Sequence, residues 1–239
     1  MVISRFDSTA KTTNTTKITR KKPMLRLSEI KLPLDHSDND LQREILRTLS
    51  IEAADLYSFS IFKRSHDARK RGRIMLIYQL DVVLAGQVES RVLETTPALP
   101  RVGPSPDTSY KFVAEPLTDF PQAHQQRPIV VGFGPCGILA ALVLAQMGLK
   151  PIVLERGQEV RQRTKETWGF WRKRKLNTES NVQFGEGGAG TFSDGKLWSQ
   201  VKDRRHLGRK VLREFVIAGA PEEILTDSRP HIGTFKLVS

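Results

Sequence analysis

Apolar side chains occupy every second position in two stretches of the N-terminal third of the chain, at residues 57–61 and 74–82. This alternation is typical of β-strands that bury one face, because successive side chains of a strand point to opposite sides. The segment between them, Ser65–Gly72, is short and polar, as the turn of a hairpin is. The pattern therefore predicts two antiparallel strands joined at this segment.

Two further elements precede the hairpin. Leu25–Leu34 is rich in leucine and isoleucine and predicts a strand. Ser37 and Asp40 have the spacing of a helix-capping signal, and the apolar residues that follow them recur at helical spacing. The order is thus β-α-β-β, and we expect a small α+β accessory domain over residues 24–96.

A different apolar pattern follows in the second half of the chain. Ile129–Val131 is a short β-branched run, Ile138–Met147 is apolar with several alanines, and Ile152–Leu154 is another apolar run. Apolar runs without alternation are typical of buried elements, so we expect a buried strand, a buried helix and a second strand parallel to the first. The proline-rich residues 97–128 predict an extended linker or a wrapped segment, because proline removes backbone donors and ends helices. An α/β domain is therefore expected at residues 129–239.

Glycines stand between the first strand and the helix at the spacing of a dinucleotide-binding turn. Gly132 permits the tight turn, Gly134 leaves room for a pyrophosphate at the backbone, and Gly137 lets the helix pack close to the sheet. Glu155, about 20 residues further on, offers its carboxylate to ribose hydroxyls and would repel the 2′-phosphate of NADP. A glycine-rich turn in another α/β fold is the alternative. The expected cofactor-binding residues also include Phe133, Pro135 and Cys136.

A second glycine cluster follows about 30 residues after this unit. Its backbone N–H groups are expected to form an anion-binding nest for the same pyrophosphate or for the ribityl chain of a flavin; a flexible surface loop is the alternative. The order Glu155-Arg156-Gly157 resembles the FAD site of glutathione-reductase-like flavoproteins, which adds Arg156 to the expected site. The residues expected from the cluster are Gly187, Gly188, Ala189, Gly190 and Thr191.

From Met24 onwards, the chain resembles the N-terminal part of a family of FAD-dependent dehydrogenases. The resemblance rests on four segments, of which the last is the most specific: Leu27–His36, Pro106–Tyr110, Val130–Gly137 and Asn181–Lys196. It implies an FAD-binding Rossmann-like domain of the two-dinucleotide-binding-domain type behind a small accessory domain. It also implies FAD as the cofactor and an FAD-dependent oxidoreductase as the function.

The chain departs from that family in length. Members are roughly twice as long, because two domains must hold flavin and substrate. We therefore expect a truncated FAD-binding domain and a fragment that is inactive by itself, with an NAD(P)H donor bound through the missing C-terminal half. The sequence does not indicate the small-molecule substrate. No side chain shows the pattern of a catalytic acid, base or nucleophile, and flavin chemistry often needs none because the cofactor carries the hydride.

Composition narrows the class of protein. Hydrophobic residues make up 38% and charged residues 27%, as in globular proteins, and no apolar run approaches the length of a membrane span. Residues 1–23 are basic and poor in apolar residues, which predicts a disordered basic tail or an upstream start ahead of Met24; a transit peptide is the alternative. The single cysteine, Cys136, excludes a disulfide within one chain and fits a cytoplasmic location.

The formal net charge of +12 raises an alternative function, that of a basic nucleic-acid-binding protein acting through its N-terminal domain. The basic residues lie in separate places rather than in one stripe, which argues against a nucleic-acid partner. Ser65–Arg71 is either a phosphate or RNA clamp or a solvated hairpin loop. The histidines show no metal-ligand spacing, so no metal site is expected.

Overall fold

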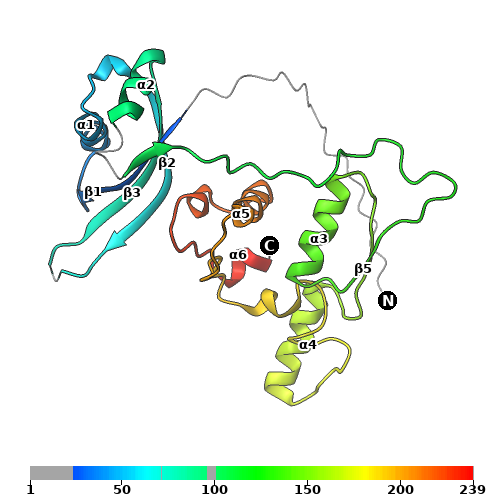
Figure 1. Cartoon of the computed structure of the whole chain (residues 1–239). Helices are drawn as coiled ribbons and strands as arrows, with labels where there is room; N and C mark the ends of the chain where they lie inside the picture. Colours follow the sequence, from blue (N-terminus) through cyan, green and yellow to red (C-terminus); the bar gives the residue numbers. More distant parts are fainter. Residues whose placement is uncertain (1–23, 71, 96–100, 239) are drawn as a thin grey trace. The chain divides into compact units, whose positions relative to one another are not determined.

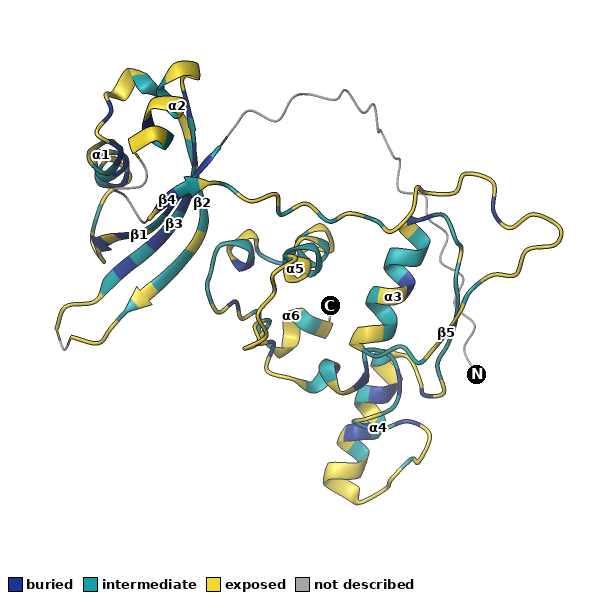
Figure 2. Ribbon diagram, in the orientation of Figure 1, coloured by how far each residue is buried: buried dark blue, intermediate teal, exposed yellow. Residues whose placement is uncertain are grey.

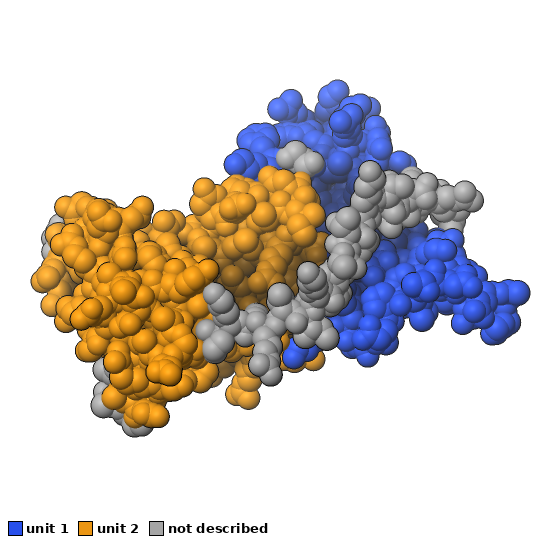
Figure 3. Space-filling model, turned by 90° about the horizontal axis from the view of Figure 1, so that it is seen from above, with its two compact units in different colours: residues 1–14, 110–196, 231–239 blue, residues 15–109, 197–230 orange. Residues whose placement is uncertain are grey.

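The computed structural model describes residues 24–70, 72–95 and 101–238, and the chain divides into two compact units (Figure 1, Figure 3). The sheet unit comprises the described residues up to Ser109 together with Leu197–Pro230. The glycine unit comprises Tyr110–Lys196 together with the end of the chain from His231. The tail predicted at residues 1–23 lies outside the described residues.

The sheet unit is built on an antiparallel sheet with the strand order β2-β3-β1-β4. The strands β1 (Leu25–Pro33), β2 (Leu56–Asp67) and β3 (Met75–Leu84) are those that the sequence predicts. The strand β4 (Val102–Pro104) lies in the proline-rich stretch and pairs with β1, which the sequence did not indicate. This edge position suits a strand that ends in proline, because an edge strand needs fewer backbone donors.

Helices cover one face of this sheet. The helix α1 (Asp38–Leu49) begins where predicted, because Ser37 and Asp40 form a reciprocal capping box at its N-terminus. A short 3₁₀ helix, η1 (Ala53–Asp55), and the helix α2 (Gly86–Thr95) complete the unit's N-terminal part. The β-α-β-β order is thus confirmed, with one further helix and one further strand.

The core lies between α1, α2 and the covered face of the sheet. β3 buries every second residue from Leu76 to Leu84, as the alternation predicts. In β2, Phe59 and Ile61 of the predicted face pack against this core, whereas Tyr57, at a register shift in the pairing with β3, is 70% exposed. The fully buried side chains of this core are Leu25, Leu27, Ile45, Leu80 and Val82.

The segment Leu197–Pro230 joins the sheet unit along β2. It contains the helix α5 (Leu207–Ile217) and the 3₁₀ helix η4 (Glu222–Leu225). The backbone N–H of Arg64 donates to the carbonyl of Thr226 over 2.7 Å, and the N–H of Ser228 donates to the carbonyl of Arg64 over 2.9 Å. Backbone pairing therefore attaches this distant segment to β2.

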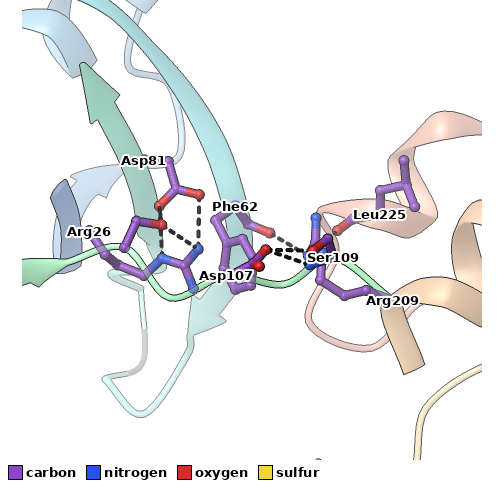
Figure 4. A network of polar contacts seen from close by, with 8 residues as sticks. Arg26, Phe62, Asp81, Asp107, Ser109, Arg209 and Leu225 are labelled. Atoms are coloured by element: carbon purple, nitrogen blue, oxygen red, sulfur yellow. Dashed lines mark hydrogen bonds and ion pairs between the residues drawn. The ribbon is translucent and has the colours of Figure 1, made fainter. Parts of the chain in front are cut away.

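Side chains reinforce that attachment (Figure 4). The Phe62 ring is contacted by two guanidinium groups, that of Arg26 at 3.3 Å from its centroid and that of Arg209 at 4.2 Å. Arg26 is itself held by a bidentate pair with Asp81 at 2.9 and 2.8 Å, and Arg209 donates to the carbonyls of Phe62 and Leu225. The aromatic ring of Phe62 thus links the sheet to α5 through cation–π contacts.

The glycine unit contains the predicted strand, helix and strand: β5 (Ile129–Val131), α3 (Pro135–Gln146) and β6 (Ile152–Leu154). β5 and β6 pair in parallel, residue for residue from Ile129 with Ile152 to Val131 with Leu154, which confirms the predicted parallel pair. The helices α4 (Val160–Lys173) and α6 (Thr234–Val238) follow, with the 3₁₀ helix η3 (Gly188–Phe192) between them.

The prediction that β5 and α3 are buried is wrong for this chain (Figure 2). Ile129 is 61% exposed and Val131 83% exposed, and in α3 only Ala141 is buried. Among the described residues, the parallel sheet has only these two strands, so no further strand pairs with either of its edges. No helix among the described residues is long and apolar enough to cross a membrane.

Candidate functional site

The turn from β5 into α3 adopts the tight geometry expected of the first glycines. Gly132 has a φ of 93°, which favours glycine, and its N–H donates to the carbonyl of Leu154 over 2.7 Å. A Cβ on Gly137 would lie 2.0 Å from the carbonyl oxygen of Gly132, so only glycine lets α3 approach the turn this closely. Both residues are therefore explained by the fold of the turn itself.

Gly134 is different, because neither its backbone conformation nor its contacts require glycine at this position. It is the N-cap residue of α3 with φ −77° and ψ −175°, an extended conformation open to any residue. A Cβ there would meet, within 4 Å, only the Cα of Gly188, at 3.8 Å. No side chain from the described residues caps the helix, so the amides of its first turn, including that of Cys136, are left for another acceptor.

The second glycine cluster packs against this turn. The N–H of Gly187 donates to the carbonyl of Phe133 over 2.8 Å. A Cβ on Gly188 would lie 2.9 Å from the Cα of Gly134, and one on Gly190 would lie 3.1 Å from Pro135 Cγ. The structure thus brings together the two glycine segments that the sequence separates by about 50 residues, and their backbones meet at the N-terminus of α3.

Glu155, at the end of β6, ties three parts of the site together. Its Oε2 accepts the backbone N–H of Phe133 at 2.6 Å, and its Oε1 accepts those of Gly157 at 2.9 Å and Gly185 at 3.0 Å. A carboxylate offers about four lone-pair positions, of which three are used here. The carboxylate therefore has fewer acceptor positions open to a ligand hydroxyl than the sequence suggested.

The electrostatics of Glu155 follow from these bonds. Its burial raises the pKa of the carboxyl, but the backbone amides of Gly157, Phe133, Gly185 and Arg156 stabilise the ionised form more strongly. The pKa of Glu155 consequently lies below its ordinary value, and the side chain is a carboxylate at neutral pH.

The chain after Glu155 touches the start of the second cluster at glycine positions. A Cβ on Gly157 would lie 2.4 Å from the Cα of Gly185, and Gly185 itself has a φ of 118°. The two backbones are therefore in direct contact. This contact gives a packing reason for the glycine in the order Glu155-Arg156-Gly157.

Arg163 on α4 holds the second cluster in place, and sequence reasoning missed it. It is fully buried, and its guanidinium donates to the carbonyls of Asn181 at 2.8 Å, Val182 at 2.6 Å and Glu186 at 2.5 Å. It also donates to the hydroxyl of Thr191 over 2.9 Å. Burial lowers the pKa of Arg163, and the nearby carboxylates of Glu155 and Glu186 partly oppose that effect.

The sequence holds little signal for this role. Arg163 lies in a polar helix among other basic residues, Arg161 and Lys165, that are exposed. Only the packing of residues 181–191 around α4 separates it from its neighbours. Glu186 forms a second link between the glycine cluster and α4, because its carboxylate accepts a hydrogen bond of 2.7 Å from the N–H of Val160 at the start of the helix.

Three residues that the sequence predicts as cofactor ligands instead contact other parts of the chain or solvent. The hydroxyl of Thr191 is buried between Arg163 and the carbonyl of Glu186, to which it donates over 3.0 Å. Arg156 turns to Glu179, at 3.0 Å, and lies over the ring of Phe184. Ala189 is exposed on the surface of η3. Cys136, by contrast, lies exposed in the first turn of α3, beside Gly134.

The chain is similar to a family model over part of its length and to a longer protein over most of it. Residues 24–83, in the sheet unit, match the family model described as "Domain of unknown function (DUF8436)". A protein of Clostridium beijerinckii described as "Uncharacterized protein" is 42% identical over 214 residues. That match covers 88% of this chain and 38% of the relative, so the chain spans well under half of its relative's length.

Proposed function

We propose that this chain supplies the adenosine and pyrophosphate part of an FAD site in an FAD-dependent oxidoreductase. The cofactor's pyrophosphate would lie at Gly134, where two glycine backbones and the N-terminus of α3 meet. An uncapped helix N-terminus carries free N–H groups and a partial positive charge, which suit phosphate. The resemblance to FAD-dependent dehydrogenases in the segments Val130–Gly137 and Asn181–Lys196 supports the same cofactor.

The proposal rests on Gly134, a position at which the fold of the chain does not require glycine. Gly137 and Gly188 are required by contacts within the chain, and Gly132 by its φ. At Gly134 a methyl group would fit without touching anything closer than 3.8 Å. A ligand in close contact with this backbone gives the missing reason for glycine at that position.

Glu155 would then face the adenosine ribose as a hydrogen-bond acceptor. It would contribute about one hydrogen bond to the cofactor, worth roughly 1.5–3 kcal/mol. The negative charge also disfavours a 2′-phosphate, in keeping with FAD rather than NADP. FAD supplies the hydride chemistry when it is bound, and the residues of this chain would bind and orient its phosphates.

The test uses Gly134→Ala and nuclear magnetic resonance of the ¹⁵N-labelled chain, which detects binding even at millimolar affinity. Titration with ADP, and separately with FAD, should shift the amide signals of Gly132 to Gly137 and of Gly187 to Gly190. Gly134→Ala should keep the stability within about 1 kcal/mol, because the change affects only the helix cap, and should abolish those shifts. Gly169→Ala, in the middle of α4, is the matched control. Equal shifts in wild type and Gly134→Ala would contradict the proposal.

A further inference from the structure

The sheet unit carries a basic cavity, remote in sequence from the glycine loops. A cavity of about 580 Å³ opens at the hairpin end of the sheet, on the side away from α1. The lining residues come from β1, from the end of β2, from the turn and from β3: Lys31, Asp67, Arg69, Lys70, Arg73 and Met75. Asp67, Arg69 and Lys70 belong to Ser65–Arg71, for which the sequence allows either a phosphate or RNA clamp or a solvated hairpin loop.

Strand pairing explains why these residues meet. Met75, the first residue of β3, pairs with Asp67 of β2 on one side and with Pro33 of β1 on the other. Lys31 lies two positions before Pro33, so its side chain leaves the same face of the sheet as that of Met75. The sequence alone gave no reason to place Lys31 beside the hairpin turn.

The described side chains that line the cavity carry a net positive charge. Among the described residues, four cationic side chains and one carboxylate line it, which gives these residues a net charge of +3 (four minus one). Arg69 engages Asp67 with two side-chain bonds, Nε at 2.7 Å and Nη2 at 2.6 Å. These bonds hold the pKa of Asp67 well below its usual range, so Asp67 stays ionised and serves to orient Arg69.

The other three cations lack such partners. Lys31, Lys70 and Arg73 form no ion pair with any carboxylate in the described part of the chain. Like charges gathered around one cavity repel each other, and only a solvent counter-ion or an anionic ligand relieves that repulsion. Lys31 of β1 adds a cation to those of the turn, so the positive potential at the cavity is higher than the turn alone would give.

The lining also restricts the class of anion. The lining residues that the structure describes include no aromatic side chain on which a nucleobase could stack. The volume of the cavity exceeds that of a single phosphate, and its charges come from three different segments. These features fit an anion with several adjacent phosphate groups that is recognised by charge.

We propose that this cavity binds a small di- or triphosphate group, with Lys31, Lys70 and Arg73 as ligands and Arg69 held in place by Asp67. The site belongs to the sheet unit, and the proposal does not depend on flavin binding by the glycine unit.

Isothermal titration calorimetry of the full chain with inorganic tripolyphosphate at low ionic strength tests this. We expect one ligand per chain, tighter than orthophosphate. Lys31→Ala and Arg73→Ala should each weaken binding about tenfold, as loss of a charge-assisted hydrogen bond does. Lys202→Ala, which removes an equal charge from an exposed position of the same unit, should leave the affinity unchanged.

Circular dichroism and thermal melting verify that each variant is folded. Absence of binding, or equal weakening by Lys202→Ala, would overturn the proposal in favour of diffuse attraction to a basic surface. Single-stranded oligouridylate binding more tightly than tripolyphosphate, with the same dependence on Lys31 and Arg73, would overturn the small-ligand class and support nucleic acid.

Discussion

At the scale of single residues, the glycines of the site are present for three separable reasons. Gly132 is needed for a backbone conformation, and Gly137, Gly157 and Gly188 for close approach of one backbone to another. Gly134 has neither reason within the described chain. A substitution at each of the first four should therefore affect folding, whereas one at Gly134 should affect ligand binding.

Gly137→Ala should destabilise the glycine unit by about 2–3 kcal/mol, because its new methyl group would overlap the carbonyl oxygen of Gly132 and move α3 away from the turn. Urea unfolding followed by the fluorescence of Trp168 and Trp171 measures the change. Gly169→Ala is the control: it meets nothing within 4 Å in the middle of α4, and should stabilise by about 0.5–1 kcal/mol. Equal effects of the two changes would show that the close approach at Gly137 has no energetic consequence.

Glu155→Gln should make the glycine unit less stable at neutral pH, by roughly 1.5–3 kcal/mol, because an amide N–H replaces one acceptor facing the backbone donors. The pKa of Glu155 is lowered on folding, so its contribution is complete above the unfolded value of about 4.3 and is lost as the pH falls through the folded value. The wild-type advantage should thus shrink below about pH 4.

Urea unfolding at a series of pH values between neutral and acidic measures this difference. Glu179→Gln is the matched control, since Glu179 forms an exposed ion pair with Arg156 that contributes little to stability. A destabilisation by Glu155→Gln that did not change with pH would contradict a role for the ionised carboxylate.

At the scale of elements, the loop before η3 is organised by a helix side chain rather than by its own packing. The loop offers its carbonyls at Asn181, Val182 and Glu186 inward, and Arg163 of α4 satisfies all three. Buried backbone carbonyls without a donor are costly, so the loop and α4 depend on each other. The position of the second glycine cluster follows from this contact.

Arg163→Lys should therefore loosen the loop although it keeps the positive charge, because a single ammonium cannot reach several carbonyls in a fixed plane. We expect a loss of about 3–5 kcal/mol, as when one partner of a buried charged network is removed. Limited proteolysis should cut within residues 181–191 faster than in wild type. The same exchange at Arg161, an exposed neighbour on α4, should change neither stability nor cleavage; faster cleavage there too would point to a general effect on α4.

At the scale of the whole molecule, the parallel pair β5 and β6 leaves apolar surface uncovered. Val131 is 83% exposed, and most of the apolar side chains of α3 are only half-buried. Open apolar strand edges favour association between chains. The chain also spans 38% of the length of its Clostridium beijerinckii relative.

Residues 1–239, purified and mixed with excess FAD, should bind flavin only weakly and should not oxidise NAD(P)H. The glycine loops address phosphates and adenosine, whereas the flavin ring needs walls and groups near its reactive nitrogen. Flavin fluorescence quenching and the absorbance of NAD(P)H measure the two expectations. Tight stoichiometric binding with turnover would show that the flavin ring lies elsewhere than this assignment implies.

The sequence by itself determined the local elements of both units, because they depend on neighbouring residues. The capping box at Ser37 and the alternation of β3 required only nearby positions, as did the glycine turn between β5 and α3. The parallel partner of β5 was also predicted, since a short strand-helix-strand unit has few other ways to pair.

Tertiary structure decided the features that join distant residues. Arg163 is buried and Arg161 exposed in the same polar helix, because only one of them faces the carbonyls of residues 181–191. Glu155 uses three acceptor positions on backbone amides, and Lys31 joins the hairpin turn through strand register. Hydrogen-bond partners far along the chain leave no periodic pattern in sequence, so only the folded backbone shows which side chain meets them.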